Sequence, residues 1–167
     1  CYDQIAHAIA SLVFQAFGVH ANAIQSMLES IQNMKFFLRT AFGDSKDFAG
    51  STIEDKFQGL CQGNGAAPAG WVVISITILC AHKKKGHGGH FICPISDLKG
   101  HLAAILYVDD CDLIHLDMED QQASVHTAHE AMQASIHNWG QLLIATGGSL
   151  KPSKCFCHMI SFNWRPD

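Results

Sequence analysis

The sequence lacks the features that mark several large classes of protein. Charged residues make up only 16% and hydrophobic residues 48% of the 167 residues, which excludes a disordered chain and allows one core but not two ordinary domains. The longest uncharged apolar run, residues 66–81, contains Pro68 and Gly70 and is shorter than the roughly 18 to 20 residues of a membrane-spanning helix. No Ser-His-Asp order, nucleotide-hydrolase phosphate loop or internal repeat is present. We therefore expect a single domain with no membrane partner.

A disulfide framework is also missing. The seven cysteines are an odd number in apolar contexts and show no paired spacing, which favours a reducing, intracellular compartment. The chain has no charged-then-apolar leader, and its first residue already belongs to a patterned segment. We expect it to be a fragment of a longer protein.

Basic residues are scarce where acidic ones gather. The net charge is -4, which disfavours a generally basic nucleic-acid binder without excluding a local basic groove. Six of the fifteen acidic residues fall in the stretch 109–120, which contains no lysine or arginine. The acidity is therefore concentrated at one place.

Hydrophobic periodicity predicts a mixed α and β chain with helix predominating. Apolar residues at helical spacing predict helices over 3–16, with Asp3 as N-cap, and over 22–34 and 121–143, and the uncharged apolar run predicts a buried helix over 68–81. Alternating apolar segments predict strands over 36–38, 91–95, 101–107 and 113–116. Residues 43–59 are polar and loop-like, with a weakly specified hairpin, and residues 149–164 are compatible with a terminal strand or hairpin.

The acidic pair Asp109-Asp110 is expected at the tip of a hairpin formed by the strands on either side. Adjacent carboxylates repel each other unless a cation lies between them, and oxygen-only ligands of this kind suit Mg²⁺, with the remaining ligands from water and phosphates. The competing interpretation is a polar turn without a ligand. On spacing alone, the polar turn is the commoner explanation.

Neighbouring segments favour the metal-binding interpretation. Tyr107-Val108-Asp109-Asp110, flanked by apolar residues, resembles motif C of reverse transcriptases. Upstream, Gln62-Gly63-Asn64-Gly65-Ala66-Ala67-Pro68 resembles motif B, with Ala67 where the family usually has serine. Downstream, residues 147–154 resemble motif D and residues 160–164 the start of motif E, and Cys1-Tyr2-Asp3 matches the end of motif A. The motifs occur in the family's order over essentially the whole chain, which is most similar to retroelement-type domains.

The resemblance implies a role for each matching residue. Asp109 would be the principal metal ligand, with Asp110 completing the acidic site beside Tyr107 and Val108. Tyr2 would lie beside the sugar of the incoming nucleotide, and Gln62 and Gly63 beside the template and nascent base pair. Lys154 would be the motif D lysine near the departing pyrophosphate, a candidate general acid. The implied cofactor is Mg²⁺, with Mn²⁺ as a substitute, and the implied partners are an RNA or DNA template-primer and dNTPs.

The fold implied by the resemblance is α+β. It is a polymerase palm-like antiparallel sheet that carries the Asp109-Asp110 hairpin, backed by the helices over 3–16 and 121–143, with incomplete fingers and no thumb. Residues 1–167 would form one partial reverse transcriptase domain, from the end of motif A through motif E. The metal-binding aspartate of motif A would lie upstream of Cys1 and is absent. We therefore expect the isolated chain to polymerise poorly or not at all.

Two other functions stay open. One is a catalytically dead remnant that at most binds nucleic acid. The other is a zinc-stabilised structural module built on Cys80, His82, His87, His90 and Cys93, whose spacing matches no standard zinc pattern. Lys83, Lys84 and Lys85 lie among these donors and are compatible with contacts to a nucleic-acid backbone or with a solvated connecting loop.

Overall fold

The computed structural model describes residues 2–52, 54–108, 110–116 and 125–160. In these residues the chain is a mixed α+β fold with four α-helices and three two-stranded antiparallel sheets. The helices are α1 (His7–Ala16), α2 (Ala21–Gln32), α3 (Ala67–Lys84) and α4 (Val125–Ala145). The strands are β1 (Lys35–Thr40), β2 (Gly43–Gly50), β3 (Gly89–Ile92), β4 (Lys99–Leu102), β5 (Ala104–Tyr107) and β6 (Asp110–Leu113).

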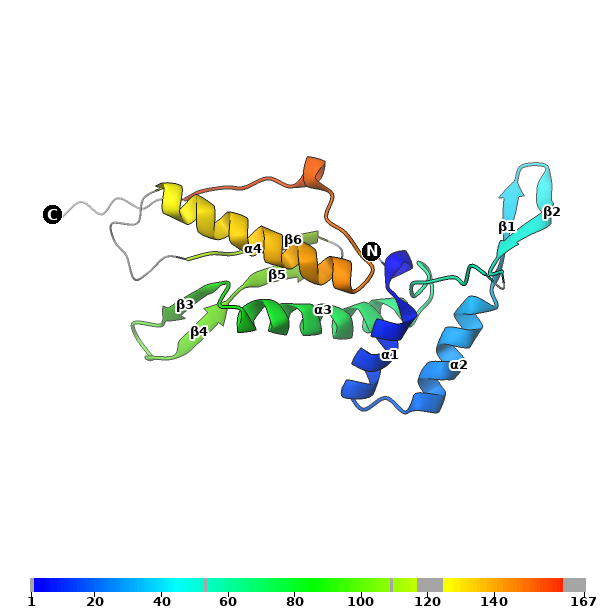
Figure 1. The fold of residues 1–167 in the computed structure, drawn as a ribbon, viewed down its shortest axis with the longest axis horizontal. Coiled ribbons are helices and arrows are strands. Elements are labelled where there is room, and N and C mark those ends of the chain that lie inside the picture. Colours follow the sequence, from blue (N-terminus) through cyan, green and yellow to red (C-terminus); the bar gives the residue numbers. More distant parts are fainter. Residues whose placement is uncertain (1, 53, 109, 117–124, 161–167) are drawn as a thin grey trace.

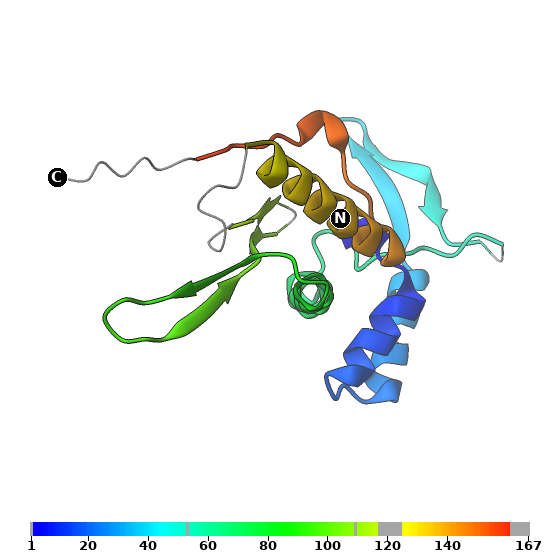
Figure 2. The same cartoon turned by 60° about the vertical axis from the view of Figure 1, so that its left-hand side comes forward.

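Helix α3 is the central element. It packs against α1 and α4, and α1 packs in turn against α2. Figure 1 shows α4 running along α3, with α1 near one end of α3 and the β3–β4 hairpin near the other. Figure 2 views α3 nearly end-on, with α4, the β3–β4 hairpin and the α1–α2 pair arranged around it. The uncharged, apolar composition of residues 67–81 suits a helix that packs on several sides, and Val72 and Ile76 stay exposed.

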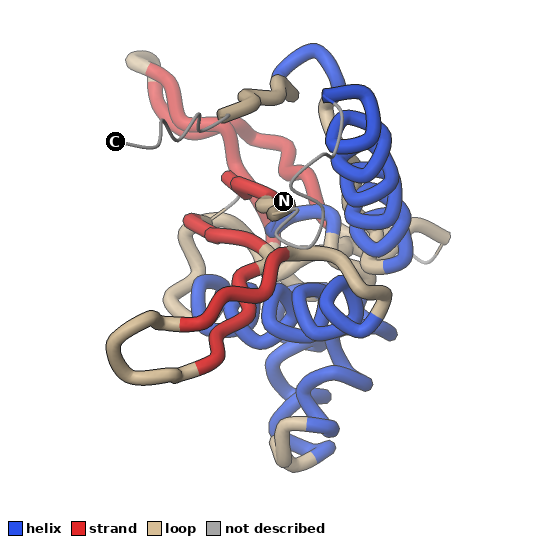
Figure 3. The backbone as a smooth tube through the Cα atoms, turned by 90° about the vertical axis from the view of Figure 1, so that its left-hand side faces the viewer, coloured by secondary structure: helices blue, strands red, loops and turns tan. Residues whose placement is uncertain are grey.

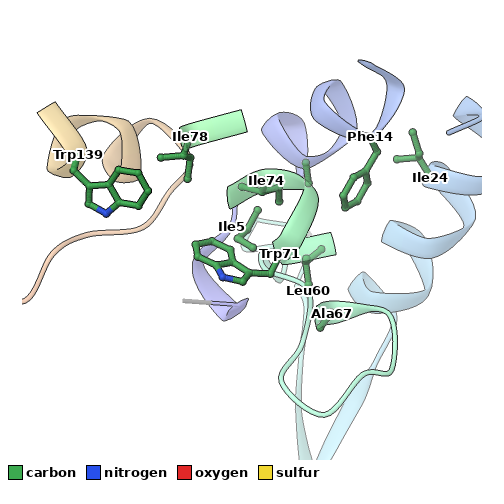
Figure 4. Close-up of a cluster of buried hydrophobic side chains, with 10 residues drawn as sticks. Ile5, Phe14, Ile24, Leu60, Ala67, Trp71, Ile74, Ile78 and Trp139 are labelled. Carbon is green, nitrogen blue, oxygen red and sulfur yellow. The ribbon is translucent and has the colours of Figure 1, made fainter. Parts of the chain in front are cut away.

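The hydrophobic core follows α3 from end to end. Trp71, Ile74 and Ile78 of α3 are buried, with Ile74 fully enclosed. Phe14 of α1 packs at one end of this row and Trp139 of α4 at the other (Figure 4). Burying large apolar side chains contributes about 1.5 to 3 kcal/mol each. The core therefore fixes α1 and α4 against the same helix.

The three hairpins are separate rather than parts of one sheet (Figure 3). The β1–β2 hairpin projects from the body (Figure 1), and Phe36, Phe37 and Phe48 are about half exposed on it. The single antiparallel sheet expected from the sequence is therefore not present among the described residues. The mixed α+β class is confirmed.

Several expected boundaries are wrong for identifiable reasons. The first expected helix is divided into a 3-10 turn, Tyr2–Gln4, and α1, because Ala6 is in an extended conformation. Helix α3 continues past Ala81 to Lys84, since lysines are good helix formers and their charge is favourable at a helix C-terminus. The return strand begins at Asp110 rather than Leu113, and residues 43–50 form a strand whose pairing with β1 is interrupted by a shift of register.

The end of the chain also departs from expectation. The described residues 149–160 contain a 3-10 turn, Pro152–Lys154, and no strand. Cys155 and Cys157 are exposed despite their apolar neighbours in the sequence. Within the described ranges, no helix has the length and apolar character needed to cross a membrane.

Candidate functional site

The β5–β6 hairpin carries the segment whose sequence resembles motif C. Tyr107 pairs with Asp110, which leaves positions 108 and 109 as a two-residue connection. Val108 has a φ of 55°, a left-handed conformation that is rare for a β-branched residue but matches the tight turns that join antiparallel strands. Asp109 lies outside the described residues. Strained residues persist where the surroundings hold them and often mark functional sites.

The two faces of this hairpin have different chemistry. Asp110 and Asp112 alternate with Cys111 and are exposed, and Tyr107, the partner of Asp110, is 77% exposed. Cys111 is directed toward the core, and burial together with the charge of Asp112 raises the pKa of its thiol to about 12. The thiol stays protonated at neutral pH, so the negative charge of the hairpin comes from its carboxylates.

Helix α3 holds the turn in place. The indole N–H of Trp71 donates a hydrogen bond to the backbone carbonyl of Val108, and the Trp71 side chain is largely buried in the core. Trp71 lies one turn into the helix that follows the motif B segment. The motif B helix and the motif C turn are therefore joined by a direct contact.

The motif B turn is anchored to the start of the chain. The backbone N–H of Gln62 donates to Oδ1 of Asp3 at 2.9 Å, and Gly59 N–H donates to the carbonyl of Ile5 at 2.7 Å. Asp3 is thus not the N-cap of a helix, as the sequence indicated, because its carboxylate is used by a segment 59 residues away. Sequence spacing carries no signal for such a contact.

Gln62 and Gly63 are both exposed on this turn. Gly63 has a φ of +93°, and a side chain there would meet no atom within 4 Å. Glycine is required by the backbone conformation, and the space beside it is open. The turn therefore presents its backbone to solvent, as the close approach of a ligand requires.

The motif D segment meets the same N-terminal residues. The N–H of Ala6 donates to the carbonyl of Thr146 at 2.9 Å. Gly147 has a φ of +95°, and a Cβ there would approach the carbonyl oxygen of Gln4 to 2.2 Å. Residues 3–6 are therefore the point at which the segments resembling motifs A, B and D come together. The side chain of Tyr2 is not among those described.

Lys154 is placed elsewhere. It is exposed in the 3-10 turn Pro152–Lys154, and among the described residues it has no ion pair with the hairpin. The segment around it lies along α4, where a cavity of about 520 Å³ is lined by Ile136 and Gly140 of α4 and by Leu150 and Phe156. Residues 161–164 of the motif E match lie outside the described ranges.

The described residues contain no group of three or more His, Cys, Asp or Glu side chains placed to hold a metal ion. In the expected zinc cluster, His82 is fully buried and both ring nitrogens have protein partners, Asn138 Oδ1 at 2.9 Å and Ser135 Oγ at 3.1 Å. Cys80 is exposed. His82 therefore has no free nitrogen for a ligand in this arrangement.

Three residues of this region escaped sequence reasoning. Asp112 shares the exposed face of β6 with Asp110, which strict alternation along the strand would have indicated. Trp71 is a core residue whose N–H also holds the turn. Asp3 was expected to cap a helix, but its carboxylate accepts from the backbone N–H of Gln62. The last two depend on tertiary contacts that no local pattern encodes.

Comparison with known proteins adds no relative: no family model matches the chain, and no curated protein or solved structure matches it.

Proposed function

We propose that this chain is the palm portion of a reverse transcriptase, an RNA-directed DNA polymerase that joins nucleotides on a template-primer. The observation that carries the proposal is the exposed Asp110 beside the β5–β6 turn, which Trp71 of α3 braces through its hydrogen bond to the carbonyl of Val108. The assignment to this family of polymerases rests on the order in which the matching motifs occur in the sequence. The convergence of the segments resembling motifs A, B and D on residues 3–6 supports it.

The carboxylates of the turn are suited to a hard cation. Asp110 is exposed, and the neighbouring residue in the sequence is Asp109. These two would hold Mg²⁺, or Mn²⁺ in its place, with water and nucleotide phosphates as further ligands. Such an ion supplies neutralisation of the charge that develops during phosphoryl transfer. Asp112 stays outside this assignment because the matching motif covers only the adjacent pair.

The other residues would position nucleic acid and nucleotide. The exposed backbone of Gln62 and Gly63 would lie against the template and the nascent base pair, where the absence of a side chain at Gly63 permits close contact. Tyr2 would stand beside the sugar and exclude a 2'-hydroxyl. Tyr107 and Val108 would flank the acids, and Lys154 would approach the departing pyrophosphate only if the segment along α4 moves toward the hairpin.

One departure from the family pattern defines the main alternative. Ala67 lies at a buried position where motif B of the family usually has a serine. The alternative function is a catalytically inactive protein that binds nucleic acid with the same surfaces.

Primer extension distinguishes the two functions. We expect a chain supplied with the motif A aspartate upstream of Cys1 to extend a DNA primer on an RNA template in the presence of Mg²⁺. Asp109→Asn should lower the rate at least about a hundredfold, because it removes a ligand charge needed in the transition state. Asp112→Asn on the same hairpin is the matched control and should retain activity. Equal extension by Asp109→Asn and the parent, with both folded by circular dichroism, would refute the site. Template-primer binding without extension would favour the inactive alternative.

A further inference from the structure

The C-terminal end of α3 and the β3–β4 hairpin that follows it are positively charged, whereas the rest of the chain is negatively charged. Residues 82–102 contain four lysines and one aspartate, whereas all other residues together contain seven basic and fourteen acidic side chains. Lys84, Lys85 and Lys99 are exposed and Lys83 is half-buried. We call the surface formed by Lys83–Lys85, His90, Lys99 and His101 the basic end.

Tertiary structure brings these residues together. His90 pairs with His101 across β3 and β4, and their rings stack with centroids 4.2 Å apart. Lys99 is two residues from His101 on β4 and therefore lies on the same face of the hairpin. Burial and the neighbouring His90 lower the pKa of His101, and Lys83 at the end of α3 lies close enough to lower it further. The helix end and the hairpin thus form one continuous surface.

A buried histidine holds this surface in position. His82 is fully enclosed between Asn138 and Ser135 of α4, and its ring stacks on His87 with centroids 4.6 Å apart. Nε2 of His101 in turn donates a hydrogen bond to the backbone carbonyl of His87 at 3.1 Å. A surface fixed in this way loses little entropy when a ligand binds.

The four lysines have no ion-pair partner among the described residues. Their positive charge is favourable at the C-terminus of α3, but that effect acts within the last turn and does not involve Lys99 on the hairpin. Exposed lysines without acidic partners, next to a stacked ring pair, are the groups with which proteins bind the phosphates and bases of a single strand.

We propose that the basic end is a second nucleic-acid site, which binds the phosphate backbone of single-stranded RNA at the opposite end of α3 from the motif C turn. Charge complementarity carries the proposal. The choice of RNA over an anionic lipid surface rests on the proposed function. The lysines bind phosphates, and the ring pair formed by His90 and His101 offers a face for a base.

RNA binding tests this proposal directly. The full chain is titrated into a fluorescently labelled, unstructured single-stranded RNA at pH 7, and fluorescence anisotropy gives the dissociation constant at several salt concentrations. The test variant is K83Q/K84Q/K85Q. The matched control is K35Q/K46Q/K56Q, which removes the same charge from exposed lysines in another region. Circular dichroism verifies that both remain folded.

We expect the test variant to bind the RNA about tenfold or more weakly than the parent. The slope of log K against log salt concentration should become shallower by about 2, because three phosphate contacts are lost. The control should stay within about twofold of the parent, since its lysines make no phosphate contact in this proposal. Equal loss in both variants would overturn the proposal, as would no RNA binding by the parent. Binding to vesicles of phosphatidylserine and phosphatidylcholine without binding to RNA would also overturn it.

The two proposals fail in different ways. Loss of affinity confined to K83Q/K84Q/K85Q supports the basic end even if no primer extension is ever observed. Conversely, extension that depends on Asp109, together with unchanged RNA affinity in the lysine variant, would overturn the basic end and leave the proposed polymerase site intact.

Discussion

The two ends of α3 are built from different interactions and carry opposite charge. At the N-terminal end, backbone hydrogen bonds and glycine contacts join residues 3–6, the motif B turn and the motif D segment, and Trp71 fixes the acidic hairpin. At the C-terminal end, stacked imidazole rings and a buried polar histidine join α3, α4 and the β3–β4 hairpin. One apolar helix can therefore support two polar surfaces, provided that each is organised by its own contacts.

Replacing one glycine at each end of α3 by alanine should show how much stability is lost by backbone strain alone and how much by strain together with a steric overlap. Gly147→Ala places a Cβ 2.2 Å from the carbonyl oxygen of Gln4 at a φ of +95°. Left-handed strain and backbone overlap together should lower the free energy of unfolding by about 3 kcal/mol. Gly86→Ala has a φ of +85° with open space around it, and should cost about 1 kcal/mol.

Chemical denaturation of the two glycine variants measures both values. If Gly147→Ala is as stable as Gly86→Ala or more stable, residues 147–154 do not pack on residues 3–6 as described.

Between pH 7.5 and 5, stability should depend on pH through His82 at the histidine-rich end. Burial is the main cause that lowers the pKa of His82. The hydrogen bond that its ring donates to Oδ1 of Asn138 raises the pKa by a smaller amount, and the neighbouring His87 lowers it slightly further. The unfolded chain therefore gains a proton near pH 6.5 that the folded chain does not bind, so stability is complete above that pH. It should fall as pH decreases toward the lowered pKa, by at most about 1.4 kcal/mol per pH unit for this proton.

Thermal unfolding between pH 7.5 and 5 checks this expectation. His82→Gln removes the titrating ring and should flatten the profile relative to the parent, whereas His129→Gln, exposed on α4, should leave it unchanged. A parent more stable at pH 5.5 than at pH 7.5 would contradict the sign.

Local pattern was sufficient for most elements and insufficient for the site. Helical spacing predicted α2 and α4 because each has an apolar face long enough to show a period, and the uncharged apolar run of residues 66–81 predicted α3. It misplaced the start of α1, since the carboxylate of Asp3 has a distant partner, and it ended α3 early because lysines were treated as a break.

At the candidate site, sequence reasoning predicted the hairpin but not what holds it. The acids and the turn were visible in Tyr107-Val108-Asp109-Asp110, whereas the bond from Trp71 and the meeting of the motif segments at residues 3–6 depend on contacts between residues far apart in the chain. The stacked histidines were likewise seen only as scattered donors.

Metal binding at the acidic turn is the central claim, and Mn²⁺ broadening of amide signals in a ¹⁵N-labelled chain tests it most directly. Mn²⁺ prefers carboxylate oxygens and substitutes for Mg²⁺ at such sites. We predict broadening of the Tyr107 and Asp110 amides before those of Lys83 and His101, and its loss in Asp109→Asn. Broadening centred on the histidines, or broadening at the turn that survives Asp109→Asn, would contradict the account.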